Sequence, residues 1–285
     1  MDIMVGATKD NIMMVEGEMD EVSEQDLIQA LKVAHEAIKP MCVLQEELAK
    51  ELGVTPEEIE KRGESLHEVN PMMGHRGVRL HVSFPLIAEV EYRAIFTATA
   101  ELQAEGLNPM PEIMIPVTIS ARELSFQKAI CDRVKAEVEG KFSTSIDYQF
   151  GTMIEIPRAA LTGDRMARTA EFFSFGTNDL TQMTFGFSRD DVGTFMGEYL
   201  GNKLLDADPF KTIDTKGVGK LVEYGIQSGR SKRPELKCGV CGEHGGDPDS
   251  IKFFNRIGID YVSCSPFRVP IARLAAAQAA IQQSK

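Results

Sequence analysis

The sequence predicts an α/β fold of the (β/α)8 TIM-barrel type that is incomplete at its N-terminal strands. Strand-like and helix-like segments alternate at least five times after residue 70, which is the pattern of a parallel sheet with crossover helices. Polar side chains follow several of these strands, as they do at the rim of barrels that carry active sites. About six barrel strands can be counted. Closing the wall would therefore require the two N-terminal strand-like runs or a partner chain.

Length and composition indicate a soluble globular protein. The 285 residues fit one large α/β domain or a domain with an appendage, and a hydrophobic content of 43% is ordinary. No apolar run approaches the roughly 20 residues that span a bilayer, and the start of the chain lacks a basic and apolar leader. Five scattered cysteines, an odd number, indicate free thiols. We expect a cytoplasmic protein without membrane association.

Charge divides the chain into two parts. Residues 1–69 carry 6 Lys and Arg against 17 Asp and Glu, a net charge of −11, whereas residues 70–285 carry 25 against 26, a net charge of −1. With the change in pattern near Gly53, this predicts an acidic strand–helix segment at residues 1–53 and a barrel domain at residues 54–285. The acidity opposes nonspecific binding of nucleic acid, which needs clustered Lys and Arg.

Residues 1–53 begin with strand-like runs at 3–6 and 11–17, followed by a helix from about Ser23, where Asp26 nearly completes a capping box. The runs 2–24 and 34–39 resemble an internal piece of bacterial polynucleotide phosphorylase. In that family they would form a strand pair and a helix near the end of an RNase PH-like domain. The phosphate- and RNA-binding parts are absent, so the resemblance implies no exoribonuclease activity.

The elements after residue 53 follow in a regular order. Thr55 as N-cap, Pro56 at the first helical position and Glu58 at the capping-box position predict a helix that runs to about His67. Strands are expected at 112–117, within 148–157, within 172–182, at 236–240 and at 260–264. Helices are expected at 89–105, 121–139, 158–171, 216–228, 247–257 and 271–282, with a long βα insertion at 183–201.

Two neighbouring strands place carboxylates at one rim. Glu155 ends the first strand and Asp179 follows the second, and the segment between them has room for one crossover helix. Adjacent parallel strands lie about 5 Å apart, so the two carboxylates can converge on one small cation. Asp179 taken alone is more often a helix cap. The pairing predicts a Mg²⁺ site; without a cation, one carboxylate would tend to hold its proton.

Polar groups near this pair can hold an anionic substrate. Gly176, Thr177 and Asn178 precede Asp179 in a predicted tight turn, where backbone N–H groups and the Asn amide can bind an anion or a carbonyl oxygen. Arg76 lies in the Gly- and Pro-punctuated loop 70–80, and its guanidinium can grip a carboxylate or phosphate. A solvated surface arginine is the alternative reading of Arg76.

Cys241 is a candidate proton donor. It belongs to a single C-x-x-C pair, and zinc would need a second pair or histidines at ligand spacing. A thioredoxin-like motif opens a helix, whereas Cys238 falls inside a predicted strand. Cys241 lies on a glycine turn beside Glu243 and His244, where a thiol can protonate a carbanion or enolate. Metal carboxylates, amide donors, a loop arginine and this thiol together suit enolate chemistry.

Five runs of residues identify a family. They are Asn-Pro-Met-Met-Gly-His-Arg-Gly at 70–77, Gly-Thr-Met-Ile-Glu-Ile-Pro at 151–157, Phe-Ser-Phe-Gly-Thr-Asn-Asp-Leu-Thr-Gln at 173–182, Cys-Gly-Glu-His-Gly-Gly-Asp-Pro at 241–248 and Tyr-Val-Ser-Cys-Ser-Pro-Phe-Arg-Val-Pro at 261–270. With them, residues 54–285 resemble the C-terminal phosphoenolpyruvate/pyruvate-binding barrel of the pyruvate, phosphate dikinase family. Phosphoenolpyruvate synthase and the sugar-transport enzyme I share this barrel, but the runs at 241–246 and 185–191 favour the dikinase.

The resemblance implies a phosphotransferase site. In the family, a phosphohistidine on a swivelling domain passes its phosphoryl group to the enolate oxygen of pyruvate, giving phosphoenolpyruvate. Carried over position by position, the resemblance implies Cys241 as the proton donor and Glu155 and Asp179 as the Mg²⁺ ligands. It also implies six substrate contacts, which are Arg76, Glu155, Gly176, Thr177, Asn178 and Asp179.

The sequence also departs from the family. It lacks the ATP-grasp and phosphohistidine domains and the first barrel strands, whose ends supply two substrate-binding arginines. We therefore expect a fusion of two unrelated fragments without a complete ATP-dependent cycle. The leading hypothesis is a pyruvate-site fragment that binds phosphoenolpyruvate or oxalate with Mg²⁺, with homodimerisation left open. The alternatives are an inactive structural or interaction module and, less favoured, RNA binding through the N-terminal segment.

Overall fold

The structure is a computed structural model that describes residues 2–18, 21–68 and 70–283, and its chain divides into two compact units, residues 1–69 and 70–285. In the first unit, strands β1 (Asp2–Ala7) and β2 (Ile12–Glu18) form an antiparallel pair, and helices α1 (Glu24–Glu51) and α2 (Pro56–Ser65) follow. The two N-terminal runs thus pair with each other in a two-stranded sheet of their own.

Both helices of the first unit begin where the capping residues predict. The Ser23 hydroxyl accepts a hydrogen bond from the backbone N–H of Asp26 at 3.1 Å. At the start of α2, Thr55 and Glu58 form a complete capping box, which satisfies two backbone N–H groups that would otherwise lack partners.

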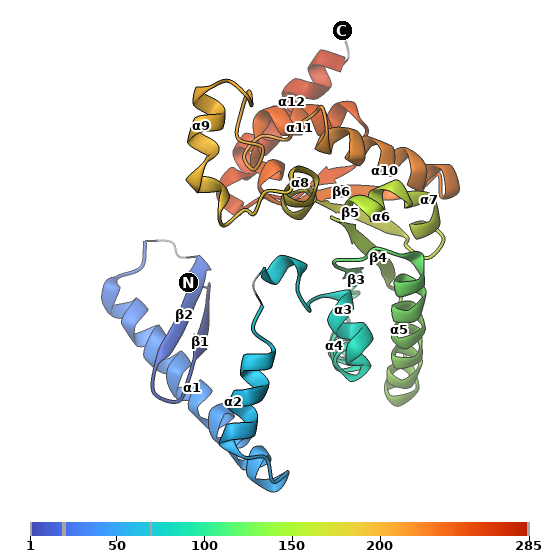
Figure 1. The fold of residues 1–285 in the computed structure, drawn as a ribbon. Coiled ribbons are helices and arrows are strands. Elements are labelled where there is room, and N and C mark those ends of the chain that lie inside the picture. The colour runs from blue at the N-terminus through green and yellow to red at the C-terminus, as the bar shows by residue number, and fades with distance from the viewer. Residues whose placement is uncertain (1, 19–20, 69, 284–285) are drawn as a thin grey trace. The chain divides into compact units, whose positions relative to one another are not determined.

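The second unit is built on a five-stranded parallel sheet, which confirms the predicted α/β class (Figure 1). Its strands, in spatial order, are β3 (Glu112–Ile115), β4 (Gln149–Ile154), β5 (Phe172–Gly176), β6 (Lys237–Cys241) and β7 (Tyr261–Val262). In the described ranges, β3 and β7 each pair on one side, so the sheet is shown as an open arc rather than a closed ring. Sequence order equals spatial order, as in a barrel wall.

The helices of the second unit lie before its first strand, in the crossovers between its strands and after its last strand. They are α3 (Val78–Ser83), α4 (Pro85–Ala104), α5 (Ala121–Phe142), α6 (Pro157–Leu161), α7 (Gly163–Met166), α8 (Thr177–Phe185), α9 (Met196–Gly201), α10 (Val218–Lys232), α11 (Pro248–Arg256) and α12 (Val269–Gln283). Short 3-10 turns are η1 (Pro71–Met73), η2 (Val192–Thr194), η3 (Glu243–Gly246) and η4 (Pro266–Arg268). Of the helices in the described ranges, none is both long and apolar enough to cross a membrane.

Two helix predictions need correction. The segment 158–171 holds two short helices, α6 and α7, instead of one. Gly163, the first residue of α7, packs against α10 so closely that a Cβ would lie 2.8 Å from the Gly225 carbonyl oxygen, and this contact sets α7 apart from α6. Helix α4 begins at Pro85 rather than near residue 89, because proline is well suited to the first helical position, where no N–H donor is needed.

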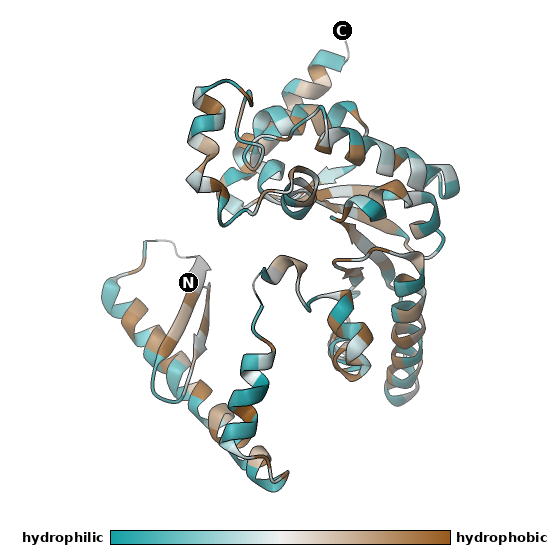
Figure 2. Ribbon diagram, in the orientation of Figure 1, coloured by the Kyte–Doolittle hydropathy of each residue, from teal (hydrophilic) through white to brown (hydrophobic). Residues whose placement is uncertain are grey.

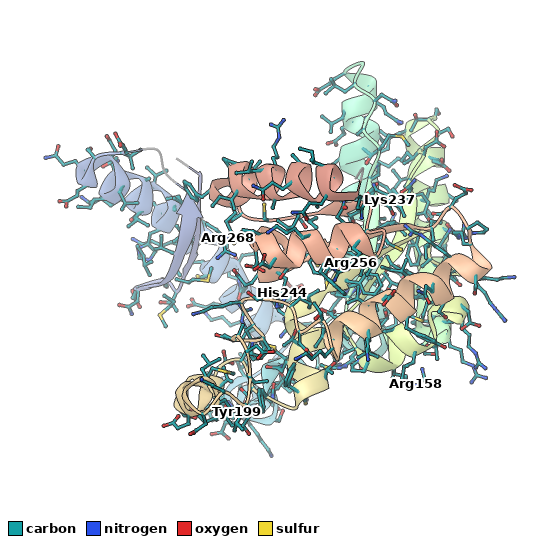
Figure 3. The ribbon with its side chains drawn as sticks, turned by 90° about the horizontal axis from the view of Figure 1, so that it is seen from above. Arg158, Tyr199, Lys237, His244, Arg256 and Arg268 are labelled. Carbon is teal, nitrogen blue, oxygen red and sulfur yellow. The ribbon has the colours of Figure 1, made fainter. Side chains whose placement is uncertain are left out.

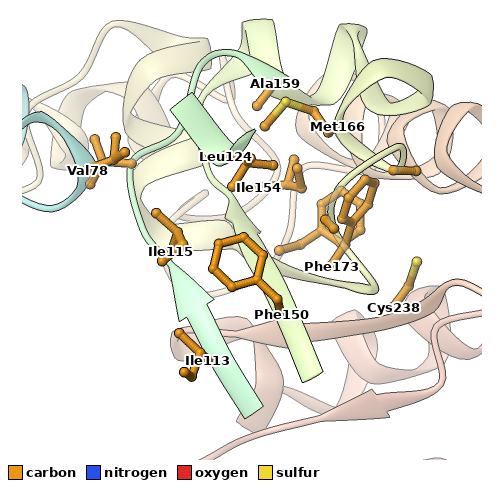
Figure 4. Close-up of a cluster of buried hydrophobic side chains, with 14 of the residues drawn as sticks. Val78, Ile113, Ile115, Leu124, Phe150, Ile154, Ala159, Met166, Phe173 and Cys238 are labelled. Carbon is orange, nitrogen blue, oxygen red and sulfur yellow. The ribbon is translucent and has the colours of Figure 1, made fainter. Parts of the chain in front are cut away.

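The core of the second unit lies on and around the central strands. All five residues of β5 are buried, as expected for a parallel strand covered on both faces. Phe150, Ile154 and Phe173 are fully buried and pack with side chains of β3 and α5 (Figure 4). The central strands are largely apolar, whereas the surrounding helices carry polar and apolar residues in turn (Figure 2). This packing holds the carboxyl ends of β4, β5 and β6 at one edge.

Candidate active site at the strand ends

The structure brings Glu155 and Asp179 together. Glu155 directly follows β4, and Asp179 lies in the first turn of α8 directly after β5. The neighbouring strands are in register, with Ile154 opposite Phe175. A Cβ placed on Gly176 would lie 2.8 Å from the Oε2 atom of Glu155, so glycine there leaves the room that the carboxylate occupies. Asp179 lies close enough to Glu155 to raise its pKa, in addition to the larger effect of burial.

A main-chain donor holds the Glu155 carboxylate. The backbone N–H of Val117 donates to Oε1 at 2.6 Å. Val117 has a φ of +60°, a left-handed conformation that is strained for a β-branched residue. Gly77 packs against this turn, where a Cβ would meet the Val117 side chain at 2.9 Å. Strained backbone of this kind persists only where its surroundings fix it, so the position of Glu155 is strongly determined.

Burial and a neighbouring acid change the protonation of this pair. Glu155 is 5% exposed. Burial raises the pKa of Glu155 to about 7, the Val117 N–H opposes this rise, Asp179 adds to it, and the positive charge of Arg76 lowers it. Near pH 7, Glu155 therefore carries its proton in about half of the molecules. A divalent cation would favour loss of that proton, which makes the donor set suitable for a cation.

Such a cation would have two protein ligands, the carboxylates of Glu155 and Asp179. Within the described residues, no group of three or more His, Cys, Asp or Glu side chains is placed to hold a metal ion. A set of one or two carboxylates, completed by water and substrate oxygens, is the usual arrangement for Mg²⁺. The donor set thus fits Mg²⁺ better than zinc, which takes three or four protein ligands.

The expected tight turn at residues 176–179 is the start of a helix. Strand β5 passes directly into α8, so Thr177, Asn178 and Asp179 form its first turn. The Thr177 side chain is fully buried, and its hydroxyl lies 2.7 Å from Nδ1 of His244. The Asn178 Oδ1 atom accepts the backbone N–H of Glu243 at 3.1 Å. The Asn178 amide is thereby oriented, with its NH₂ end as the remaining donor.

Cys241 ends strand β6 beside the carboxylate pair. Its Sγ atom lies 3.7 Å from the Phe175 carbonyl oxygen, and the residue is half-buried. Burial raises the pKa of the Cys241 thiol, a hydrogen bond with Ser174 opposes the rise, and the charges of Glu155 and Asp179 add to it. Cys241 therefore remains a protonated thiol at neutral pH. This is the form that a proton donor requires.

The second cysteine of the C-x-x-C pair has a different environment. Cys238 is fully buried inside β6, and its Sγ lies 3.6 Å from the Leu236 carbonyl oxygen. Burial raises the pKa of Cys238 to about 12. Both cysteines are free thiols. Cys238 therefore contributes packing to the core, while Cys241 lies at the rim.

Arg76 is an exposed side chain on the loop before α3, and its charge reaches Glu155, whose pKa it lowers. Its neighbour Arg79 is used differently, because its guanidinium donates to the Gly74 carbonyl oxygen at 2.8 Å and so holds the loop closed. Of the two loop arginines, Arg76 is the one with its charge directed to the site.

His244 is a structural part of the site that sequence reasoning did not assign. It is fully buried, and its Nε2 atom lies 2.8 Å from the Pro209 carbonyl oxygen. A carbonyl only accepts, so Nε2 donates and Nδ1 accepts from the Thr177 hydroxyl. Burial lowers the pKa of His244, which keeps the ring neutral. His244 thereby joins the segment at Pro209 to the first turn of α8.

Glu243 was also left without a role by the sequence. Its carboxylate lies 3.0 Å from a guanidinium nitrogen of Arg268 and 3.7 Å from one of Arg189. Figure 3 labels Arg268 and His244, which lie in the 3-10 turns η4 and η3 after strands β7 and β6. Nothing in the spacing of Glu243 could reveal these partners, since they come from separate loops.

Comparisons with known proteins place the chain in a family. Residues 5–281 match the profile of the PEP-utilising enzyme, PEP-binding domain. The chain is 56% identical over 238 residues to pyruvate, phosphate dikinase of Clostridium symbiosum, covering 83% of this chain and 27% of that protein. It is 54% identical over 235 residues to pyruvate, phosphate dikinase 1, chloroplastic, of Arabidopsis thaliana, covering 82% and 24%.

The chain thus spans about a quarter of the length of these relatives. A solved citrate lyase from Burkholderia xenovorans aligns with a TM-score of 0.44 at 13% identity, covering 66% of this chain and 53% of that one, a likeness too low to carry an argument. The resemblance of residues 1–50 to polynucleotide phosphorylase finds no support, because the family match already begins at residue 5. The chain belongs to the family of PEP-utilising enzymes, as a PEP-binding domain.

Proposed function

We propose that the second unit is the pyruvate half-site of a dikinase-type phosphotransferase. In this reaction a phosphoryl group passes between a phosphohistidine of another domain and the enolate oxygen of pyruvate. The observation that carries the proposal is the meeting of Glu155, Asp179 and Cys241 at one edge of the sheet, where each carboxylate raises the pKa of the thiol. The names of the relatives support the same reaction.

Glu155 and Asp179 would hold Mg²⁺ in this site. When bound, the ion would supply positive charge to the oxygen on which negative charge develops. The Val117 N–H fixes one oxygen of Glu155 at 2.6 Å, so the carboxylate is oriented before any ligand arrives. Such preorganisation lowers the cost of binding, because little rearrangement remains to be made.

Arg76 and Asn178 would orient the substrate. The exposed guanidinium of Arg76 suits the carboxylate or phosphate of the substrate. The Asn178 amide, fixed through its Oδ1 atom, would donate from its NH₂ end to a substrate oxygen. Gly176 and Thr177 would contribute backbone at the start of α8, since the Thr177 hydroxyl is already engaged with His244.

Cys241 would donate a proton to the substrate carbon or remove one from it. When phosphoenolpyruvate gives up its phosphoryl group, the enolate of pyruvate needs a proton on its methylene carbon, and the protonated thiol would donate it from one face. In the opposite direction, the thiolate would take a proton from the methyl group. The raised pKa of Cys241 keeps the thiol protonated when the site is empty.

The direct test is calorimetric binding of oxalate, which resembles the pyruvate enolate, with phosphoenolpyruvate as a second ligand. We expect oxalate to bind with Mg²⁺ and not in EDTA. Asp179→Asn should weaken binding more than about tenfold, because it removes one of two charged metal ligands. Asp147→Asn is the matched control, since Asp147 is exposed before β4, at the opposite end of that strand from Glu155.

Two results would count against the half-site. Oxalate binding that survives both EDTA and Asp179→Asn would show that the carboxylate pair is not the ligand. A cooperative thermal transition that responds to neither Mg²⁺ nor oxalate would favour the alternative, an inactive structural or interaction module. A complete ATP-dependent cycle would further require ATP-grasp and phosphohistidine domains, which can be added as separate proteins once binding is shown.

A further inference from the structure

A pocket of the second unit, away from the carboxylate pair in its lining, is rich in basic residues. It has a volume of about 510 Å³ and lies between the start of α5 and the α6–α7 segment. Its lining residues are Ser120, Ala121, Arg122, Arg158, Thr162, Arg165 and Arg168. A pocket of this size can hold a small organic ligand. Four of its seven lining residues are arginine, and no carboxylate is among them.

The four arginines, Arg122, Arg158, Arg165 and Arg168, carry uncompensated charge. In the described part of the chain, none of them forms an ion pair, although other exposed arginines of the same unit do. The nearest acidic residue in α5, Glu123, turns to the backbone, where its carboxylate accepts the N–H groups of Ile119 at 2.7 Å and Ser120 at 3.0 Å. The pocket is therefore a local positive region in a chain of net charge −12.

The walls of this pocket are fixed by the fold. The Arg158 guanidinium donates to the Ile119 carbonyl oxygen, which ties α6 to the loop before α5. The Ser125 hydroxyl lies 3.2 Å from that of Thr169, which ties α5 to the turn after α7. The first turn of α5 also opens at the pocket, and a helix N-terminus favours negative charge. The basic groups are thus gathered before a ligand binds.

We propose that this pocket binds a small soluble anion with two or more adjacent phosphate groups, such as an oligophosphate. One phosphate monoester carries about −1.5 to −2 at pH 7, which would leave part of the charge of four guanidinium groups unbalanced. Two or three adjacent phosphates match that charge. Their oxygens also suit the forked geometry of arginine, which binds phosphate through paired hydrogen bonds.

The pocket shares no lining residue with the carboxylate site. The inference is therefore independent of the proposed function, and each can fail without the other. Binding can be measured in EDTA, where the Mg²⁺-dependent site would not take up a ligand.

The experiment uses inorganic triphosphate as the probe on the complete 285-residue chain, with calorimetry at low salt in EDTA. We expect the double variant Arg165→Gln/Arg168→Gln to weaken binding by at least about tenfold. Added salt should weaken binding of the unchanged protein, since the interaction is largely electrostatic. Both arginines are exposed, so the fold should survive, which circular dichroism will check.

A double control variant, Arg256→Gln/Arg273→Gln, removes the same charge from exposed positions outside the pocket. It should leave the affinity for triphosphate within about twofold of the original, because distant surface charges are screened. Equal weakening in both double variants would overturn the proposal, because net charge alone would then explain binding. Failure of the unchanged protein to bind triphosphate at low salt would overturn it as well.

Discussion

Replacing Glu155 with Gln tests the buried carboxylate directly. In the absence of Mg²⁺, an acid whose pKa is higher in the folded than in the unfolded protein opposes folding at high pH, because unfolding allows it to ionise freely. The opposition begins above the unfolded value of 4.5 and is complete above the folded value of about 7. Gln cannot ionise, and its side chain can still accept the Val117 N–H and donate to Asp179. The variant should therefore be the more stable protein at pH 8.

The expected size follows from the pKa of Glu155. A rise from 4.5 to about 7, at about 1.4 kcal/mol per pH unit, corresponds to about 3 kcal/mol. For a unit of this size, each kcal/mol shifts the melting temperature by about 2–4 °C. Glu155→Gln should thus raise the melting temperature by roughly 6–12 °C at pH 8 and by little at pH 5. Added Mg²⁺ should stabilise the original protein and not the variant.

The assay is thermal unfolding followed by circular dichroism at pH 5 and pH 8, with EDTA or Mg²⁺. Glu235→Gln, an exposed glutamate before β6, serves as the control for a change of charge alone. The reasoning is refuted if Glu155→Gln changes the melting temperature equally at both pH values. A variant that is less stable than the original protein at pH 8 without Mg²⁺ would refute it too.

Three further predictions concern the neighbours of this carboxylate. Gly176→Ala should abolish Mg²⁺-dependent oxalate binding and destabilise the unit by about 1–3 kcal/mol, since its Cβ would lie 2.8 Å from atoms of Glu155. Gly193→Ala, the control, has open space around its Cβ and should do neither. Equal effects of the two variants in calorimetry and thermal unfolding would contradict this. Iodoacetamide should label Cys241 slowly at pH 7 and faster as pH rises, because its raised pKa keeps the thiol protonated; mass spectrometry showing rapid labelling at pH 7 would contradict it. His244→Phe should cost about 1–3 kcal/mol in urea unfolding, because both hydrogen-bond partners of the buried ring lose their contact; an unchanged midpoint would speak against this role.

Much of the fold could be predicted because its signals are local. The apolar runs at β4 and β5 are short, dense and bounded by polar residues, which is how buried parallel strands appear in a sequence. Thr55 and Glu58, three residues apart, form a capping box and so predict the start of their helix. The division of 158–171 into two helices was missed because its cause, the contact of Gly163 with Gly225, joins residues distant in the chain.

The candidate site shows the same division between local and distant information. Glu155 and Asp179 could be paired because each follows a strand and neighbouring parallel strands finish at one edge. The backbone N–H of Val117, which holds Glu155, could not be predicted. Valine rarely adopts a positive φ, so nothing in the sequence indicates the left-handed turn that directs this N–H to the carboxylate. The four-arginine pocket was missed as well, because its members are spread from residue 122 to residue 168 and only the folded crossovers gather them.

The left-handed turn at Val117 also determines which replacements a mutational library would tolerate. Its contribution to Glu155 comes from the amide of the main chain, so a replacement at this buried position would keep the contact only where the backbone keeps its left-handed conformation. Glycine should be accepted most readily, because it adopts positive φ without strain. Proline should be rejected, because it removes the donor and demands a negative φ. Selection for a working carboxylate would thus favour glycine and exclude proline at position 117.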